Sequence, residues 1–131
     1  MTADERLHLI RVKVERAKQH LRDLEVVRNS FINGNSYRIE REYHQQAGHN
    51  IYRVFDIQTP PAEIGLLAGD VIHNLRSALD HLAYQLVYVN GAAHSKQTAF
   101  PIWDNPSEYK AQRARRVKGM TQSAIDAIDE L

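Results

Sequence analysis

Cysteine is absent from this chain of 131 residues, and so are the features that would direct it to a membrane or out of the cell. Without cysteine there can be no disulfide and no thiolate chemistry, which is typical of proteins from a reducing interior. The N-terminal stretch MTADERLHLIRVKVER lacks the apolar core of a signal peptide. No stretch reaches the roughly 18 uncharged apolar residues of a membrane span. We therefore expect a soluble, cytoplasmic protein without a membrane partner.

An excess of charge of one sign is also missing, because 17 Lys and Arg residues face 16 Asp and Glu residues. With a net charge of +1, no overall field attracts nucleic acid or membrane, so recognition by charge depends on local patches. One basic run is either a site for a phosphate backbone or, as we prefer, a solvated helix face. It consists of Lys110, Arg113, Arg115, Arg116 and Lys118.

Two long helices are predicted from the spacing of apolar residues. Thr2 and Glu5 form a capping box, and apolar residues then recur every three or four positions, which predicts a helix from Ala3 to about Asn29. The second helix should run from about 61 to 89. Because the apolar stripes of residues 7–24 and 68–86 are long and complementary, we expect these helices to pack antiparallel along most of their length.

The remaining segments are shorter. Residues 36–58 alternate Tyr, Ile, Val and Phe with polar residues, which predicts a β-hairpin arm between the long helices. Asn105 should cap a helix that ends near Gly119, and Thr121 should cap a last one. The expected fold is mainly α: an antiparallel long-helix bundle with an inserted β-hairpin and two short C-terminal helices. We expect a single helical domain over 1–131, the N-terminal part of a longer protein, because a helical pattern is still running at Leu131.

The stretch HNLRSALDHLAYQLVYVN, residues 73–90, presents an unusual polar face. From Ile64 to Ser95 the chain has neither Lys nor Glu, and Arg76 is its only fixed cation. Short polar side chains and tyrosines suit a buried, hydrogen-bonded surface. The face is a helix–helix or subunit interface, a catalytic or ligand site, or plain solvent-exposed surface, and we expect a homodimer through residues 70–88. Six residues fall within about 80° on the helix: Asp70, Asn74, Ser77, His81, Tyr84 and Tyr88.

Within this face, Arg76 and His81 are separated by four residues, a spacing that resembles the Arg-x(4–6)-His motif of HEPN domains. The resemblance implies a metal-independent ribonuclease of toxin–antitoxin or defence type, with a composite site at a dimer interface. Histidine titrates near neutral pH, so His81 would be the general acid/base, and Arg76 would stabilise the charge on phosphate. A second match, Arg38 to His44, lies in the predicted hairpin. Supporting roles would fall to Asn74, Ser77, Asp80 and Tyr84.

A second resemblance concerns residues 65–131. The stretch GDVIHNLRSALDHLAYQLV, followed by TAFPIW and a KGM-type turn, resembles a group of uncharacterised bacterial proteins, and it implies no function. We carry two hypotheses: a helical, oligomeric interaction module without catalysis, and a HEPN-like ribonuclease that would act on RNA. Whether the chain is an enzyme stays open.

Metal chemistry is the rival interpretation of the same helix. Asp70 and His73 have the spacing of a carboxylate–imidazole pair on one helix face, but such a pair needs further ligands. The first helix offers only His8 and His20. We therefore expect no metal and no other cofactor. Trp103, the single tryptophan, is expected to plug a loop over the core rather than to stack on a base.

Overall fold

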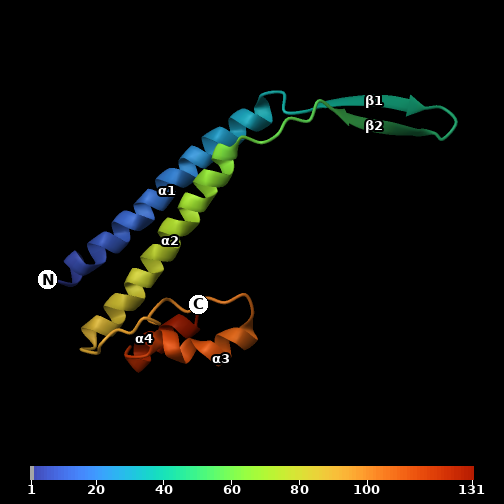
Figure 1. Cartoon of the computed structure of the whole chain (residues 1–131). Coiled ribbons are helices and arrows are strands. Elements are labelled where there is room, and N and C mark those ends of the chain that lie inside the picture. The colour runs from blue at the N-terminus through green and yellow to red at the C-terminus, as the bar shows by residue number, and fades with distance from the viewer. Residues whose placement is uncertain (1) are drawn as a thin grey trace. The chain divides into compact units, whose positions relative to one another are not determined.

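A computed structural model describes residues 2–131. The described chain has four helices and one two-stranded antiparallel sheet, so the predicted mainly α fold with an inserted hairpin and two short C-terminal helices is confirmed (Figure 1). In chain order the elements are α1 (Ala3–Asn33), β1 (Arg38–His44), β2 (His49–Phe55), α2 (Ala62–Val89), α3 (Pro106–Val117) and α4 (Gln122–Asp129).

The start of α1 is fixed by the predicted capping box. The backbone N–H of Thr2 donates to the Glu5 carboxylate at 2.6 Å, and the N–H of Glu5 donates to the Thr2 hydroxyl at 3.2 Å. The helix continues past the expected end at Asn29 to Asn33. It stops where Asn35 takes a left-handed conformation with φ 58°, a backbone geometry that an α-helix cannot accommodate.

The two strands pair in the register Ile39 with Val54, Arg41 with Tyr52, and so on to His44 with His49. The turn closes through hydrogen bonds from the N–H groups of Ala47 and Gly48 to the carbonyl of His44. Directly paired residues share a face, so the hairpin has two faces of different composition.

The caps of α3 and α4 also follow the predictions. The Asn105 side chain accepts from the N–H of Glu108 at 2.9 Å, and the Thr121 hydroxyl accepts from the N–H of Ala124 at 3.3 Å. Between the two helices Gly119 has φ 94°, and a Cβ there would lie 3.0 Å from a methyl group of Val87. Only glycine fits this position, which lets the turn approach α2 closely.

The chain divides into two compact units. The core unit comprises the described residues up to Ala17 and residues 72–131, and the hairpin unit comprises residues 18–71. The core unit has a hydrophobic cluster in which α3 and α4 pack on the C-terminal half of α2. Its buried members are Ala83, Val87, Phe100, Val117, Met120 and Ile128, with Leu79, Leu82, Leu86, Ala92, Ala124 and Ile125 packed around them.

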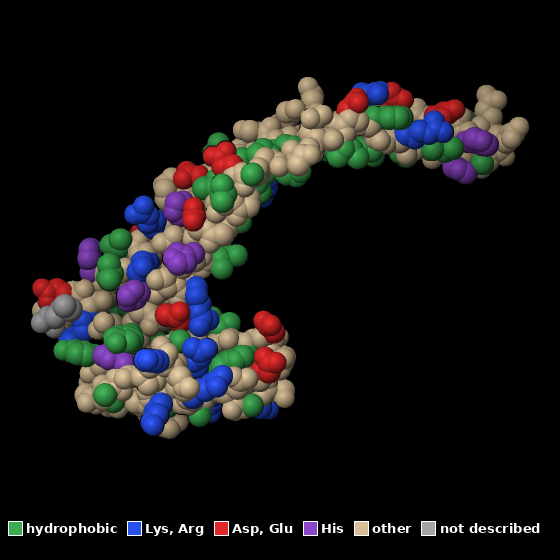
Figure 2. Space-filling view, in the orientation of Figure 1, with side chains coloured by type: hydrophobic (Ala, Val, Ile, Leu, Met, Phe, Trp, Pro, Cys, Tyr) green, Lys and Arg blue, Asp and Glu red, His purple; other side chains and the backbone are tan. Residues whose placement is uncertain are grey.

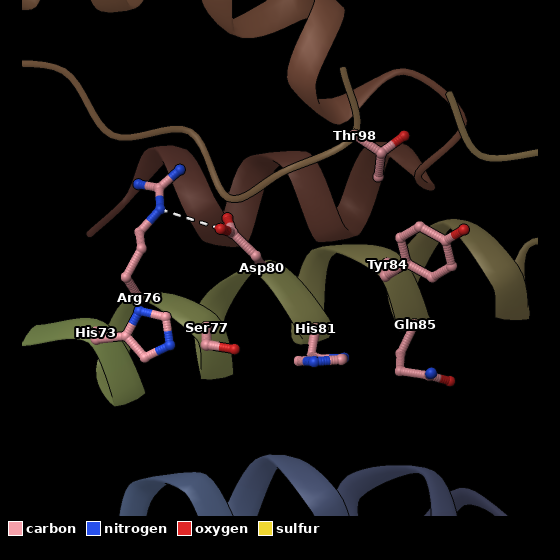
Figure 3. A pocket seen from close by; sticks show the side chains of 8 residues that line it. All are labelled: His73, Arg76, Ser77, Asp80, His81, Tyr84, Gln85 and Thr98. Carbon is pink, nitrogen blue, oxygen red and sulfur yellow. Dashed lines mark hydrogen bonds and ion pairs between the residues drawn. The ribbon is translucent and has the colours of Figure 1, made fainter. Parts of the chain in front are cut away.

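Within the core unit, the beginning of α1 runs antiparallel to the end of α2 (Figures 1 and 3). The guanidinium of Arg6 lies 5.4 Å from the ring centroid of Tyr88, and Ala17 and Ala78 are buried. The predicted apolar stripe of α2 is covered only in part, because Leu75 is 41% exposed. Over residues 2–131, no helix combines the length and apolarity that crossing a membrane requires.

Candidate functional site

The polar face of α2 borders a cavity of about 580 Å³ in the core unit. Figure 3 shows that Arg76, Asp80 and Tyr84 point toward the loop that carries Thr98, whereas Ser77 and His81 point toward α1. The side chains of α2 that line this cavity therefore point in two directions, some toward the loop and others toward α1. Its lining residues are His73, Arg76, Ser77, Asp80, His81, Tyr84, Gln85 and Thr98.

Arg76 and Asp80 hold the backbone of Phe100. The Arg76 Nε donates to Asp80 Oδ2 at 3.2 Å, and one of its terminal nitrogens donates to the Phe100 carbonyl at 3.1 Å. The Phe100 N–H donates to Asp80 Oδ1 at 3.0 Å. Phe100 is buried and belongs to the hydrophobic cluster, so its backbone polar groups need partners away from water. Asp80 accepts from the N–H and Arg76 donates to the carbonyl, so Arg76 helps to attach the loop to α2.

The aromatic end of the polar face contacts the loop that follows α2, although Tyr84 stays 44% and Tyr88 55% exposed. The ring of His94 stacks on Tyr84 with centroids 3.4 Å apart, and the ring of Tyr88 lies 6.3 Å from His94. The guanidinium of Arg6 in α1 also lies over the Tyr88 ring. These contacts lie within one chain, so two of the tyrosines that suggested a subunit interface have intramolecular neighbours.

His81 differs from Arg76 because it has no hydrogen bond or ion pair to another residue in the part of the chain that the structure describes. It is half-buried and lines the cavity. Both predicted catalytic residues border one cavity, but their side chains point in different directions, as expected for positions five apart on a helix (Figure 3). Ser77 lies beside them on the cavity, while Asn74 is half-buried and outside the lining.

The residues of the metal alternative do not meet further ligands. Asp70 and His73 are both exposed. Among residues 2–131 no three His, Asp or Glu side chains come together in a group that could hold a metal ion.

The roles of Phe100 and His94 were missed at the level of sequence. Arg76 and Asp80 are four apart on one helix, and this spacing could have indicated an ion pair. No pattern in the sequence indicates that this pair binds Phe100, because Phe100 lies 24 residues after Arg76 and 20 residues after Asp80. His94 lies in a loop without periodicity, so its stacking on Tyr84 has no sequence pattern.

Comparison with known proteins matches the chain to no family model, no curated protein and no solved structure.

Proposed function

We propose that this chain is a helical interaction module that forms a homodimer through its hairpin unit. One observation carries the proposal: no hydrophobic residue within residues 18–71, all of which are described, is buried. Ser36 is the only buried residue there, at 5% exposure. Burial of apolar surface is the main driving force of folding, so a unit that leaves such side chains uncovered gains stability from a partner.

The uncovered side chains occur on all parts of the hairpin unit. Scattered exposed hydrophobic residues are ordinary on a protein surface, but here they are accompanied only by half-buried ones, such as Leu24, Phe31 and Leu67, and by no buried one. The exposed large hydrophobic residues are Leu21, Val26, Ile32, Tyr37, Ile39, Tyr43, Tyr52, Val54, Ile57 and Leu66.

The two faces of the hairpin differ in a way that supports a partner on one of them. On the charged hairpin face (residues 38, 40, 42, 44, 49, 51, 53 and 55), Arg53 donates to Glu42 at 2.7 Å, and Arg38 lies over the Phe55 ring at 4.9 Å. On the opposite face, defined here as the apolar hairpin face, lie Ile39, Arg41, Tyr43, Asn50, Tyr52 and Val54. An isolated two-stranded hairpin is marginally stable in water, so covering this face would stabilise it.

A second copy of the chain suits this surface. The hairpin unit has six Lys and Arg residues against seven Asp and Glu residues, a formal charge of 6 − 7 = −1, so two copies do not repel strongly. Arg41 and Tyr52 are directly paired on the apolar hairpin face. A two-fold axis along the strands would place each Arg41 over the other copy's Tyr52, a favourable cation–π arrangement.

We place the contact on the hairpin unit rather than on residues 70–88. Asp80 and Tyr84 of that face already contact Phe100 and His94 of the same chain. The scarcity of Lys and Glu there thus has an explanation within one chain.

The test is the oligomeric state measured by light scattering across a range of concentrations. We expect a dimer, and Val54→Glu on the apolar hairpin face should weaken it about tenfold or more, since a buried unpaired charge is costly. His49→Glu, on the charged hairpin face, is the matched control and should leave the dimer intact. A monomer at all concentrations, or a dimer indifferent to Val54→Glu, would refute the proposal.

A second candidate is a HEPN-like ribonuclease, favoured because His81 has no hydrogen-bond partner among the described residues and lines the same cavity as Arg76. Its test is cleavage of single-stranded RNA in EDTA, with 2′,3′-cyclic phosphate ends. His81→Ala should then lower the rate about 10²–10⁴-fold, and His44→Ala in the hairpin should not. Arg76→Ala is informative only if folding is retained, because Arg76 also holds Phe100. No cleavage by the folded protein would eliminate this candidate.

A further inference from the structure

A second cavity in the core unit, of about 300 Å³, lies where α3 meets α4. Three cationic side chains line it, those of Lys110, Arg113 and Lys118, and no carboxylate does. Gln122 adds an uncharged amide to the lining. A hollow with cations and no anion among its lining side chains favours a negatively charged ligand.

The cavity is part of a larger concentration of positive charge. Five Lys and Arg residues lie between positions 110 and 118, while Glu108 is the only acidic residue of α3. Figure 2 shows Lys and Arg side chains gathered over the part of the molecule that α3 and α4 form. The positive charge is therefore concentrated on α3 and at its C-terminal end, whereas the α4 segment carries the acidic residues Asp126, Asp129 and Glu130.

Two of these cations have partners within the chain. Arg113 forms an ion pair with Asp129 at 3.1 Å, and Arg116 lies over the Trp103 ring at 5.8 Å. Lys110 and Lys118 are exposed and form no ion pair with another described residue, so their ammonium groups are available to a ligand.

We propose that this surface of α3 and α4, the basic cavity, binds phosphate groups of a nucleic-acid strand. Lys110 lies in α3 and Lys118 directly follows its last residue, Val117, which is about 10 Å further along the helix axis than Lys110. The two lysines can therefore meet successive parts of an extended polyanion rather than one ion. Nucleic acid is favoured over a membrane surface because the apolar side of α3 is already used: Val117 is buried in the hydrophobic cluster. A helix that lies on a membrane needs a free apolar face.

Binding at the basic cavity should depend strongly on salt and weakly on base sequence. Its lining has no aromatic side chain on which a base could stack. Trp103 has Arg116 over its ring and the edge of Tyr109 at 5.8 Å, so it does not offer an open stacking surface. Lysine contacts to phosphate release counterions and carry no sequence information.

The experiment measures fluorescence anisotropy of a labelled single-stranded RNA and a labelled DNA duplex with the full chain. The double variant Lys110→Gln/Lys118→Gln should bind about tenfold more weakly than the unmodified chain. The slope of the logarithm of its binding constant against the logarithm of the salt concentration should become shallower by about 0.7 to 0.9 for each lysine removed. The matched control, Arg11→Gln/Arg16→Gln on the part of α1 in the core unit, removes the same charge and should change neither quantity. Light scattering on both variants separates this proposal from dimerisation, which uses other residues.

Three results would overturn the proposal. One is the absence of binding at about 50 mM salt, where phosphate contacts are strongest. Another is an equal loss in both double variants, which would assign the effect to net charge. The third concerns competition. If polyglutamate or inorganic phosphate displaced the labelled nucleic acid as effectively as unlabelled strand does, the ligand of the basic cavity would be an acidic protein or a free ion.

Discussion

The core unit, which is built of helices alone, and the hairpin unit, which joins helix ends to a two-stranded hairpin, bury their side chains very differently. In the core unit, Ala83 and Val87 are fully covered by residues that arrive from α3, α4 and the loop before them. In the hairpin unit, helix ends and a hairpin are formed without a single buried hydrophobic residue. Local hydrogen bonds and caps are thus enough to form helices and a hairpin. A hydrophobic core forms only where further segments, here α3 and α4, pack on a helix.

The comparison also separates two ways of using polar residues. In the core unit Arg76 and Asp80 are committed to one backbone residue and attach a loop to a helix. In the hairpin unit the Arg38 and Arg53 ion pairs lie in solvent, where such pairs contribute little to stability. Polar contacts in the core unit are therefore expected to affect folding, while those of the hairpin unit are expected to affect solubility and the choice of partner.

The largest expected effect tests the core unit. Phe100→Ala removes a buried ring from the hydrophobic cluster and should lower the free energy of unfolding by about 3–5 kcal/mol. Chemical denaturation followed by circular dichroism measures this loss. A change below that of an ordinary surface substitution would show that the cluster does not hold the core unit together.

A smaller loss is expected when the contact with the Phe100 backbone is broken. Asp80→Ala leaves the Phe100 N–H and the Arg76 guanidinium without their carboxylate, and it should cost about 1–3 kcal/mol. Denaturation curves measure the cost, and Asp126→Ala, an exposed acidic residue of α4, is the control. If both variants unfold alike, the Asp80 contacts contribute nothing measurable.

Much of the fold follows from local signals in the sequence. The capping residues Thr2, Asn105 and Thr121 each satisfy backbone donors three positions away, and local chemistry of this kind is readable without a structure. The alternation of residues 36–58 likewise predicts the hairpin, and the structure confirms it.

The candidate site could be predicted only in part, because it depends on contacts between distant segments. The helical period places Ser77, His81 and Tyr84 on one side of α2, and all three line the cavity. The helical period does not predict that the loop with His94 and Phe100 contacts Tyr84 and Asp80 of α2, since a loop has no repeating pattern. The expectation of a buried face is met only in part, because Ser77 and His81 are half-buried while Tyr84 and Tyr88 are exposed.

A pH-dependent effect is expected at the hydrogen bond from the Tyr109 hydroxyl to Asp129, 2.6 Å long. Burial raises the pKa of Tyr109, and the hydrogen bond and charge of Asp129 raise it further. The folded state therefore holds this proton more tightly than the unfolded state. The resulting stabilisation is fully present below the unfolded pKa of about 10 and is lost as the pH rises through the folded pKa.

Tyr109→Phe should cost about 1 kcal/mol at neutral pH. Above about pH 10 the difference from the unmodified protein should shrink, and a constant difference would contradict the assignment.

The smallest expected effect on stability concerns the hairpin unit and completes the comparison. Tyr52 is 62% exposed on the apolar hairpin face, so Tyr52→Ala in the dissociated chain removes few contacts. Its free energy of unfolding should change by no more than about 0.5 kcal/mol at concentrations where the chain is monomeric. At concentrations where the dimer forms, the same substitution should lower the midpoint of denaturation, because stability is then linked to association. Denaturation at two concentrations measures both values. A large loss in the dilute sample would mean that Tyr52 stabilises the hairpin unit within one chain, and the apolar hairpin face would then need no partner.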